Sequence, residues 1–210
     1  MAGRIIQRIE ALAAISESPD GLTRICFSPE HRRAGDLILR WMEEDGLAAR
    51  MDEIGNVIGR YEGNVPGLPC LMIGSHYDTV RDAGKWDGPL GVLTALECVA
   101  DIARRGVRLP FALEVVGFAD EEGVRFSSTL LGSRAVAGTF DWGTLEARGS
   151  DGLTMREAIS STASITADTA SLRRLSSAAR MSRLKRTRPG MTLVAPGSAV
   201  IWPTVPTSPG

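Results

Sequence analysis

The chain has 210 residues, of which 43% are hydrophobic and 23% are charged, and its formal net charge is −1. This length is enough for one hydrophobic core, and the near-neutral charge excludes a general attraction to nucleic acid or to a membrane surface. The three cysteines lie far apart and form no C-x-x-C pair, which argues against a disulfide framework or a zinc ribbon. We therefore expect reduced, buried thiols.

The N-terminal segment gives no sign of export. It lacks a hydrophobic signal core, and no apolar run in the chain approaches the roughly 20 residues that span a bilayer. We expect a cytoplasmic protein with neither nucleic acid nor a membrane as its partner.

Two helices and a hairpin are expected first along the chain. Apolar residues recur at helical spacing between residues 5 and 12, and a second helix is predicted to begin with Ser28 as its N-cap and Pro29 as its first residue and to stop at Gly46. Short strands at 47–51 and 57–61 flank Gly55-Asn56, a pair that suits a tight turn.

The next segments are typical of an α/β domain. Residues 70–73 form a short apolar run, 111–119 are almost continuously apolar, and between them an apolar stripe predicts a helix that begins near Gly88-Pro89. We expect both apolar runs to be core strands. Candidate ligands follow each strand, so they should meet at the carboxyl edge of the sheet, where open α/β sheets place their sites.

His76 is the candidate ligand after the first core strand. A lone histidine beside a strand is more often a hydrogen-bonded core or loop residue than a metal ligand. Here Asp78 lies two residues further on, where an extended chain places it on the same side, able to hold one ring nitrogen while the other faces a metal.

Acidic residues supply the remaining candidates, and each has an ordinary structural interpretation beside the functional one. Asp87 could cap the helix that follows it, or it could bridge two cations. Asp120-Glu121-Glu122 could be a solvated turn. Adjacent carboxylates at the end of a buried strand repel each other, however, unless a cation offsets them.

Several motifs in the same order resemble a known family. They are Ser28-Pro29-Glu30-His31, Trp41-Met42, the stretch from Gly55 to Arg60, the stretch from Gly74 to Val80, Asp87-Gly88, the stretch from Glu121 to Phe126, and Gly132-Ser133. The chain from about Gly21 to Glu157 resembles the metal-dependent amidohydrolases of the M20 peptidase-like superfamily, in the hydantoinase/carbamoylase branch that includes allantoate amidohydrolase and N-carbamoyl-L-amino-acid hydrolase.

The resemblance implies a role for each site residue. His76 and Glu122 would each bind one of two divalent ions, zinc or manganese, and Asp87 would bridge them. Glu121 would be the general base, and Asp78 would orient His76. The implied reaction is hydrolysis of a carbon–nitrogen bond in a small ureido or carbamoyl substrate. An aminopeptidase or deacylase of the same superfamily is the alternative with the same metal chemistry.

The resemblance also implies parts that this chain lacks. The family uses two further histidines, one in a downstream His-x-Glu-Gln segment, and an inserted domain through which it forms homodimers. The only other histidine here is His31, which we expect at the surface. The expected fold is therefore an incomplete metallopeptidase-like three-layer α/β sandwich with a central mixed sheet, and a non-catalytic truncated fragment with weak metal binding remains the alternative to an active enzyme.

The composition changes near residue 160. After Asp168 there is no acidic residue, seven basic ones fall between Arg173 and Arg188, and five of the eleven prolines lie at 189–209. We expect residues 1–159 to form the N-terminal part of the catalytic domain. Residues 160–210 are expected to be an irregular, disordered tail outside the family's reading frame that cannot readily complete the sheet.

Overall fold

The computed structural model describes residues 1–162 and 202–203. Most of residues 160–210, on which the predicted disordered tail falls, therefore lie outside the described residues. The described helices and strands are α1 (Ala2–Ala13), α2 (Pro29–Glu44), β1 (Ala48–Met51), β2 (Val57–Tyr61), β3 (Cys70–His76), α3 (Pro89–Arg104), β4 (Ala112–Phe118), α4 (Leu131–Ala137), the 3₁₀ helix η1 (Trp142–Glu146), α5 (Met155–Thr162) and β5 (Trp202–Pro203).

The strands form a mixed sheet, as the sequence predicts. Its order is β1-β2-β4-β3-β5, and only the β3–β4 pair is parallel. The predicted hairpin is β1–β2, which pairs antiparallel across the turn that contains Gly55 and Asn56. The two-residue strand β5 pairs with β3 at Leu71 and Met72.

The parallel pairing decides where the candidate site forms. It sets His76, the last residue of β3, opposite Phe118, the last residue of β4. The residues that follow each strand therefore leave the same edge of the sheet side by side. In consequence the His76–Asp78 segment and the acidic segment that begins at Asp120 are neighbours, although they lie far apart in the sequence.

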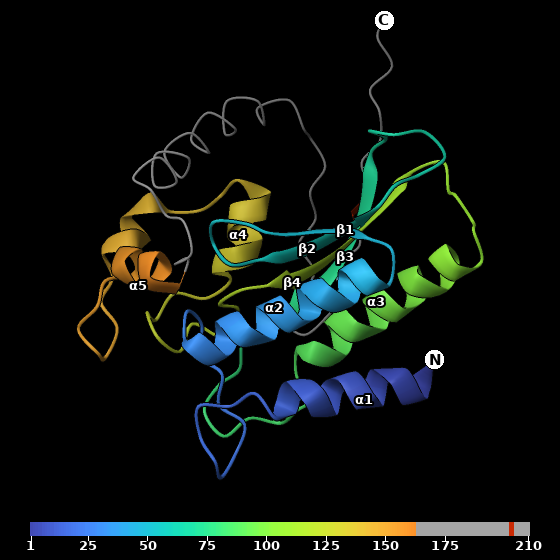
Figure 1. Ribbon diagram of the computed structural model, residues 1–210. Helices are drawn as coiled ribbons and strands as arrows, with labels where there is room; N and C mark the ends of the chain where they lie inside the picture. Colours follow the sequence, from blue (N-terminus) through green and yellow to red (C-terminus); the bar gives the residue numbers. More distant parts are fainter. Residues whose placement is uncertain (163–201, 204–210) are drawn as a thin grey trace, which may run out of the picture.

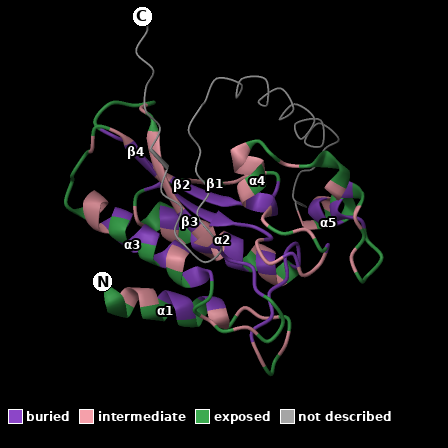
Figure 2. Cartoon of the chain, turned by 180° about the vertical axis from the view of Figure 1, so that it is seen from behind, coloured by how far each residue is buried: buried purple, intermediate pink, exposed green. Residues whose placement is uncertain are grey.

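Helices α2 and α3 cover one face of the sheet, and α1 packs against α3 (Figure 1). The start of α2 follows the predicted chemistry, because Ser28 Oγ accepts the backbone N–H of His31 and Pro29 occupies the first turn. Buried residues line the sheet and the inner sides of these helices, whereas the outer sides are exposed (Figure 2). The core lies mainly between this helical layer and the sheet, with α4 against β4 beyond it.

Two expectations about individual side chains need correction. Of the three cysteines only Cys26 is buried, while Cys70 is partly exposed and Cys98 is exposed on α3. His31 is not a surface residue: it is only 2% exposed, because the first turn of α2 points its ring onto Tyr77, with ring centroids 4.2 Å apart. Among the described helices, none is long and apolar enough to cross a membrane.

Candidate metal centre

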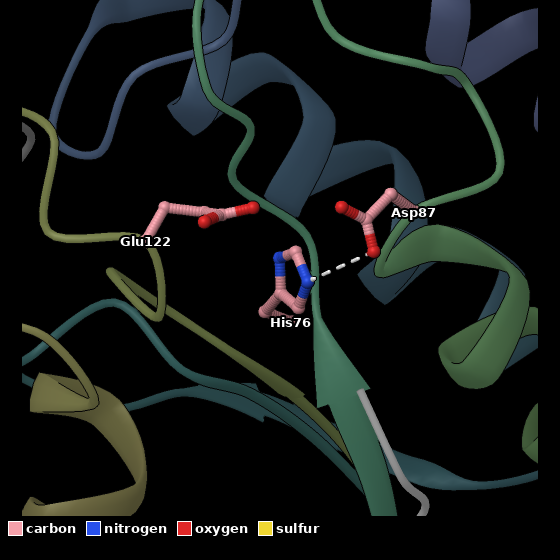
Figure 3. Close-up of side chains that lie close together, drawn as sticks. All are labelled: His76, Asp87 and Glu122. Carbon is pink, nitrogen blue, oxygen red and sulfur yellow. Dashed lines mark ion pairs between the residues drawn. The ribbon is translucent and has the colours of Figure 1, made fainter. Parts of the chain in front are cut away.

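The three predicted ligands converge at the carboxyl edge of the sheet. His76, Asp87 and Glu122 each offer one ligand atom, and these atoms all lie within 4.8 Å of one another (Figure 3). They come from the end of β3, the segment before α3 and the loop after β4. We call this set the metal cluster.

His76 is buried and its two ring nitrogens face different groups. Nδ1 lies 3.0 Å from the backbone oxygen of Asp78 and 3.6 Å from its Oδ1, whereas Nε2 lies 3.8 Å from Asp87 Oδ1. Burial lowers the pKa of His76, but its contacts with Asp78 outweigh burial and raise that pKa to about 9. Holding Nδ1 in this way leaves Nε2 to face the two carboxylates of the metal cluster.

Asp87 does not cap α3. The N-cap residue is Gly88, and no side chain caps the helix. The side chain of Asp87 is 66% exposed and its carboxylate is directed at His76 (Figure 3). The capping interpretation is therefore wrong, and the carboxylate is free to serve as a ligand.

Gly88 is required by the space beside the imidazole. Its φ is +77°, and a Cβ added there would lie 2.5 Å from His76 Cε1 and 2.6 Å from Nδ1. Any side chain at this position would displace the ring and strain the backbone. Glycine therefore lets the start of α3, and Asp87 with it, approach the histidine closely.

The acidic loop after β4 is not a solvated turn. Asp120 is 1% exposed, and both of its carboxylate oxygens are buried without a hydrogen-bond partner among the described residues. Burial and the neighbouring Asp78 carboxylate raise the pKa of Asp120 to about 8. Partial burial and the negative charges around Glu122 also raise the pKa of Glu122.

Asp78 connects the two strand ends. Its carboxylate oxygens accept the backbone N–H of Glu121 at 3.2 Å and of Glu122 at 3.4 Å, while the same residue contacts the ring of His76. Burial raises the pKa of Asp78, but these contacts and nearby histidines outweigh it, so that the pKa is lowered. Asp78 thus orients more than the sequence indicates: it holds the imidazole and the acidic loop together.

The donor set suits a divalent cation. It combines an imidazole nitrogen with carboxylate oxygens, the ligands that zinc and manganese accept in hydrolases. Carboxylates gathered beside a buried histidine also repel one another, and a cation would offset that repulsion. Glu121 lies next to Glu122 in the loop and is not one of the three cluster residues.

A separate cavity of about 610 Å³ lies near the start of α2 and includes none of the three cluster residues. Its lining contains Arg32, Arg81 and Arg125 together with three acidic residues. Since Arg32 pairs with Asp36 and Arg125 pairs with Asp151, the charges of the lining largely offset one another. We do not assign this cavity to the metal centre.

Sequence reasoning missed two buried residues that support the site. Arg24 is fully buried and donates to the backbone oxygens of Tyr77 and Leu12, which fixes the chain between His76 and Asp78. Asn56 is also fully buried and contacts the end of β4. A single arginine beside apolar residues carries no pattern that signals its own burial. Asn56 was visible as a turn residue and as part of a family motif, with no role at the site.

Known proteins match this part of the chain. The profile of peptidase family M28 matches residues 56–148. An N-carbamoyl-L-amino acid amidohydrolase of Geobacillus stearothermophilus is 43% identical over 157 residues, which are 74% of this chain and 38% of the relative. Allantoate deiminase 1 of Glycine max is 43% identical over 143 residues, which are 67% of this chain and 30% of that protein.

A solved structure supports the same family as these sequence matches. A hydantoinase/carbamoylase family amidase from Burkholderia ambifaria superposes with a TM-score of 0.72 and 30% identity, covering 77% of this chain and 40% of that one. The matched part of this chain is homologous to the hydantoinase/carbamoylase amidohydrolases. The matching profile bears the M28 name and not the M20 name of the predicted superfamily, while the predicted branch is confirmed. The chain spans about a third of the length of these curated relatives.

Proposed function

We propose that this chain carries part of the metal centre of a hydrolase that cleaves carbon–nitrogen bonds in small ureido or carbamoyl compounds, of the allantoate or N-carbamoyl-L-amino-acid type. The observation that carries the proposal is the convergence of His76, Asp87 and Glu122 within 4.8 Å at the edge of the sheet. The amidohydrolase and deiminase names of the relatives support the class of substrate.

In this proposal each residue has one task. His76, Asp87 and Glu122 hold one or two divalent ions, zinc or manganese, which when bound lower the pKa of a water and polarise the substrate carbonyl. Glu121 accepts a proton from the attacking water and returns it to the leaving nitrogen, so that the carbon–nitrogen bond breaks as the new carbon–oxygen bond forms. Asp78 keeps the imidazole and the Glu121 backbone in place.

A second candidate is a non-catalytic fragment that binds metal weakly. It is favoured by the chain's coverage of about a third of its relatives and by a cluster of three ligands in the described residues. Two ions held by a hydrolase usually share more donors than these three. An aminopeptidase or deacylase is a third candidate, and the match to the profile of peptidase family M28 is consistent with it.

Metal content combined with product release separates these candidates. The full chain is loaded with Zn²⁺ or Mn²⁺, dialysed and analysed for bound metal, and ammonia release is measured with allantoate and with an N-carbamoyl-L-amino acid. An enzyme binds two ions per chain and turns one substrate over. At most one loosely held ion and no turnover supports the fragment.

Three variants assign the roles. We expect His76→Ala to lose bound metal, and Glu121→Gln to keep it while losing turnover, because Glu121 is the proposed base and not a ligand. Glu43→Gln removes an exposed carboxylate of α2 outside the cluster and is the control. If Glu43→Gln lowers metal content as much as His76→Ala does, the assignment of the cluster is wrong.

A further inference from the structure

The turn between β1 and β2 ends in an asparagine whose whole side chain is engaged. Asn56 is fully buried. Its Oδ1 accepts the backbone N–H of Ala119 at 3.0 Å, and its Nδ2 donates to Asp52 Oδ2 at 2.8 Å and to the backbone oxygen of Gly132 at 3.1 Å. A buried amide with every partner in place is costly to disturb, because each lost bond leaves a buried polar group unpaired.

These bonds close the base of the loop that carries the acidic residues. Ala119 is the first residue after β4, and Gly132 lies in the first turn of α4. The N–H of Gly132 donates to the backbone oxygen of Ala119 at 2.9 Å, and Asn56 contacts both residues from the other side. The two ends of the loop at 119–132 are therefore held together by their own backbone bonds, which include Leu131 N–H to the oxygen of Asp120 at 3.1 Å, and in addition by the amide of Asn56.

The fit at that point leaves no space. A methyl group added to Gly132 would overlap Asn56 Oδ1 and would lie 2.6 Å from the backbone oxygen of Ala119. Close packing of this kind allows few alternative positions for the loop base. The backbone of Glu121 and Glu122, which leaves this base, can then meet the carboxylate of Asp78.

The same turn also contacts the end of β3. The hydroxyl of Tyr77, the residue after His76, donates to the backbone oxygen of Gly55 at 2.6 Å. Gly55 and Asn56 are consecutive, so one turn holds the strand end that carries His76 and the loop that carries Glu122. A shift of the turn would change the separation of two ligands of the metal cluster.

We propose that Asn56 is a positioning residue for the metal cluster. It touches none of the three ligands and acts by fixing the loop that presents Glu121 and Glu122 to His76. This inference rests on the proposed function in one respect, namely that the cluster binds metal. Groups that hydrogen-bond metal ligands directly are worth about 10- to 100-fold in metal affinity, and because Asn56 acts one step further out we expect an effect near the lower of these values.

The variants separate positioning from general stability. Asn56→Ala removes all three bonds. The double variant Asn56→Asp with Asp52→Asn keeps an acceptor for Ala119 N–H and restores the bond between residues 52 and 56 with donor and acceptor exchanged, but it loses the bond to the backbone oxygen of Gly132. Val99→Ala shortens a buried side chain of α3, away from the loop, and serves as the control for lost stability.

Two measurements on the full chain test whether Asn56 positions the metal cluster. Zn²⁺ affinity is measured by competition with a chelating dye, and hydrogen exchange of the Glu121 and Glu122 amides is followed without metal. We expect Asn56→Ala to weaken Zn²⁺ binding about 10-fold or more and to accelerate exchange of both amides by about the same factor. The double variant keeps two of the three bonds and should recover part of both effects, and Val99→Ala should show neither.

The inference is overturned if Asn56→Ala matches Val99→Ala in both measurements. It is also overturned if the double variant recovers neither the Zn²⁺ affinity nor the slow hydrogen exchange of the two amides. The exchange measurement needs no metal, so it also separates the two proposals. If the unaltered chain binds no Zn²⁺ while Asn56→Ala still accelerates exchange at Glu121 and Glu122, the proposed function fails and the positioning role stands for the loop alone.

Discussion

The space between the sheet and α3 differs in kind from the carboxyl edge of the same sheet. Under α3 the fully buried side chains are apolar, and Val92, Leu93 and Leu96 are 0% exposed. At the edge the buried set is polar and includes Arg24, His31, Asn56, His76, Asp78 and Asp120. All the described buried side-chain atoms without a hydrogen-bond partner belong to Arg24, His31 and Asp120.

The apolar residues under α3 therefore stabilise the fold, whereas the buried polar residues at the edge of the sheet serve the site. Apolar burial contributes the free energy of folding, whereas buried polar groups reduce it unless they are satisfied. A metal site needs such groups nevertheless. We therefore expect substitutions under α3 to change stability alone, and substitutions at the strand ends to change metal binding or the pH dependence of stability.

The largest expected effect is on the apolar side. Leu96→Ala removes a fully buried side chain and should lower the free energy of unfolding by about 2–5 kcal/mol, because the lost burial adds to the cavity left behind. Urea unfolding measures this change. The Zn²⁺ affinity of the folded fraction should equal that of the unaltered chain, and a parallel loss of affinity would contradict the separation.

The second expected effect concerns His31. Burial lowers the pKa of His31 to about 4, whereas an unfolded histidine titrates near 6.5. The unfolded chain therefore binds more protons between these pH values, so stability falls as the pH drops from about 6.5 towards about 4, by up to about 3 kcal/mol.

His31→Phe keeps a ring against Tyr77 and should remove this part of the pH dependence. Urea unfolding of both chains at several pH values from 7 to 4.5, in the presence of a chelator, measures the difference. Other titrating groups are common to both chains and cancel in the comparison. Identical pH dependences would show that His31 is not buried in its neutral form.

The smallest expected effect in free energy lies in the metal site itself. Asp78→Asn supplies one acceptor where two backbone N–H groups need acceptors, so the loop with Glu121 and Glu122 loosens. We expect Zn²⁺ affinity to fall about 10- to 100-fold. Glu146→Gln, at an exposed position in η1, is the control. An affinity that follows the control would remove Asp78 from the site.

The sequence alone predicts the larger elements and misses the smaller ones. The apolar stripes of α1, α2 and α3 and the runs of β3 and β4 are long enough to show their period. Helices α4, η1 and α5 have between five and eight residues, too few for an apolar stripe to be distinguished, and α4 follows Leu130 in a left-handed conformation that no sequence rule signals.

The site, like the fold, has residues that the sequence could place and residues that it could not. Residues 76 and 122 could be brought together in advance, because each follows a core strand and the two strands end at one edge, whereas Asp87 joined them only through the family resemblance. The burial of His31 could not, because it depends on the angle at which α2 crosses the sheet. The role of Asn56 was hidden for a related reason: a turn asparagine looks the same whether or not a distant loop contacts its amide.

The most direct test of the metal centre is X-ray absorption at the zinc edge. The full chain is loaded with one equivalent of Zn²⁺ and compared with His76→Ala. The account predicts nitrogen and oxygen ligands at about 2.0–2.2 Å, with one imidazole whose signal is lost in His76→Ala. A sulfur ligand from one of the cysteines, or a spectrum that His76→Ala leaves unchanged, would contradict it.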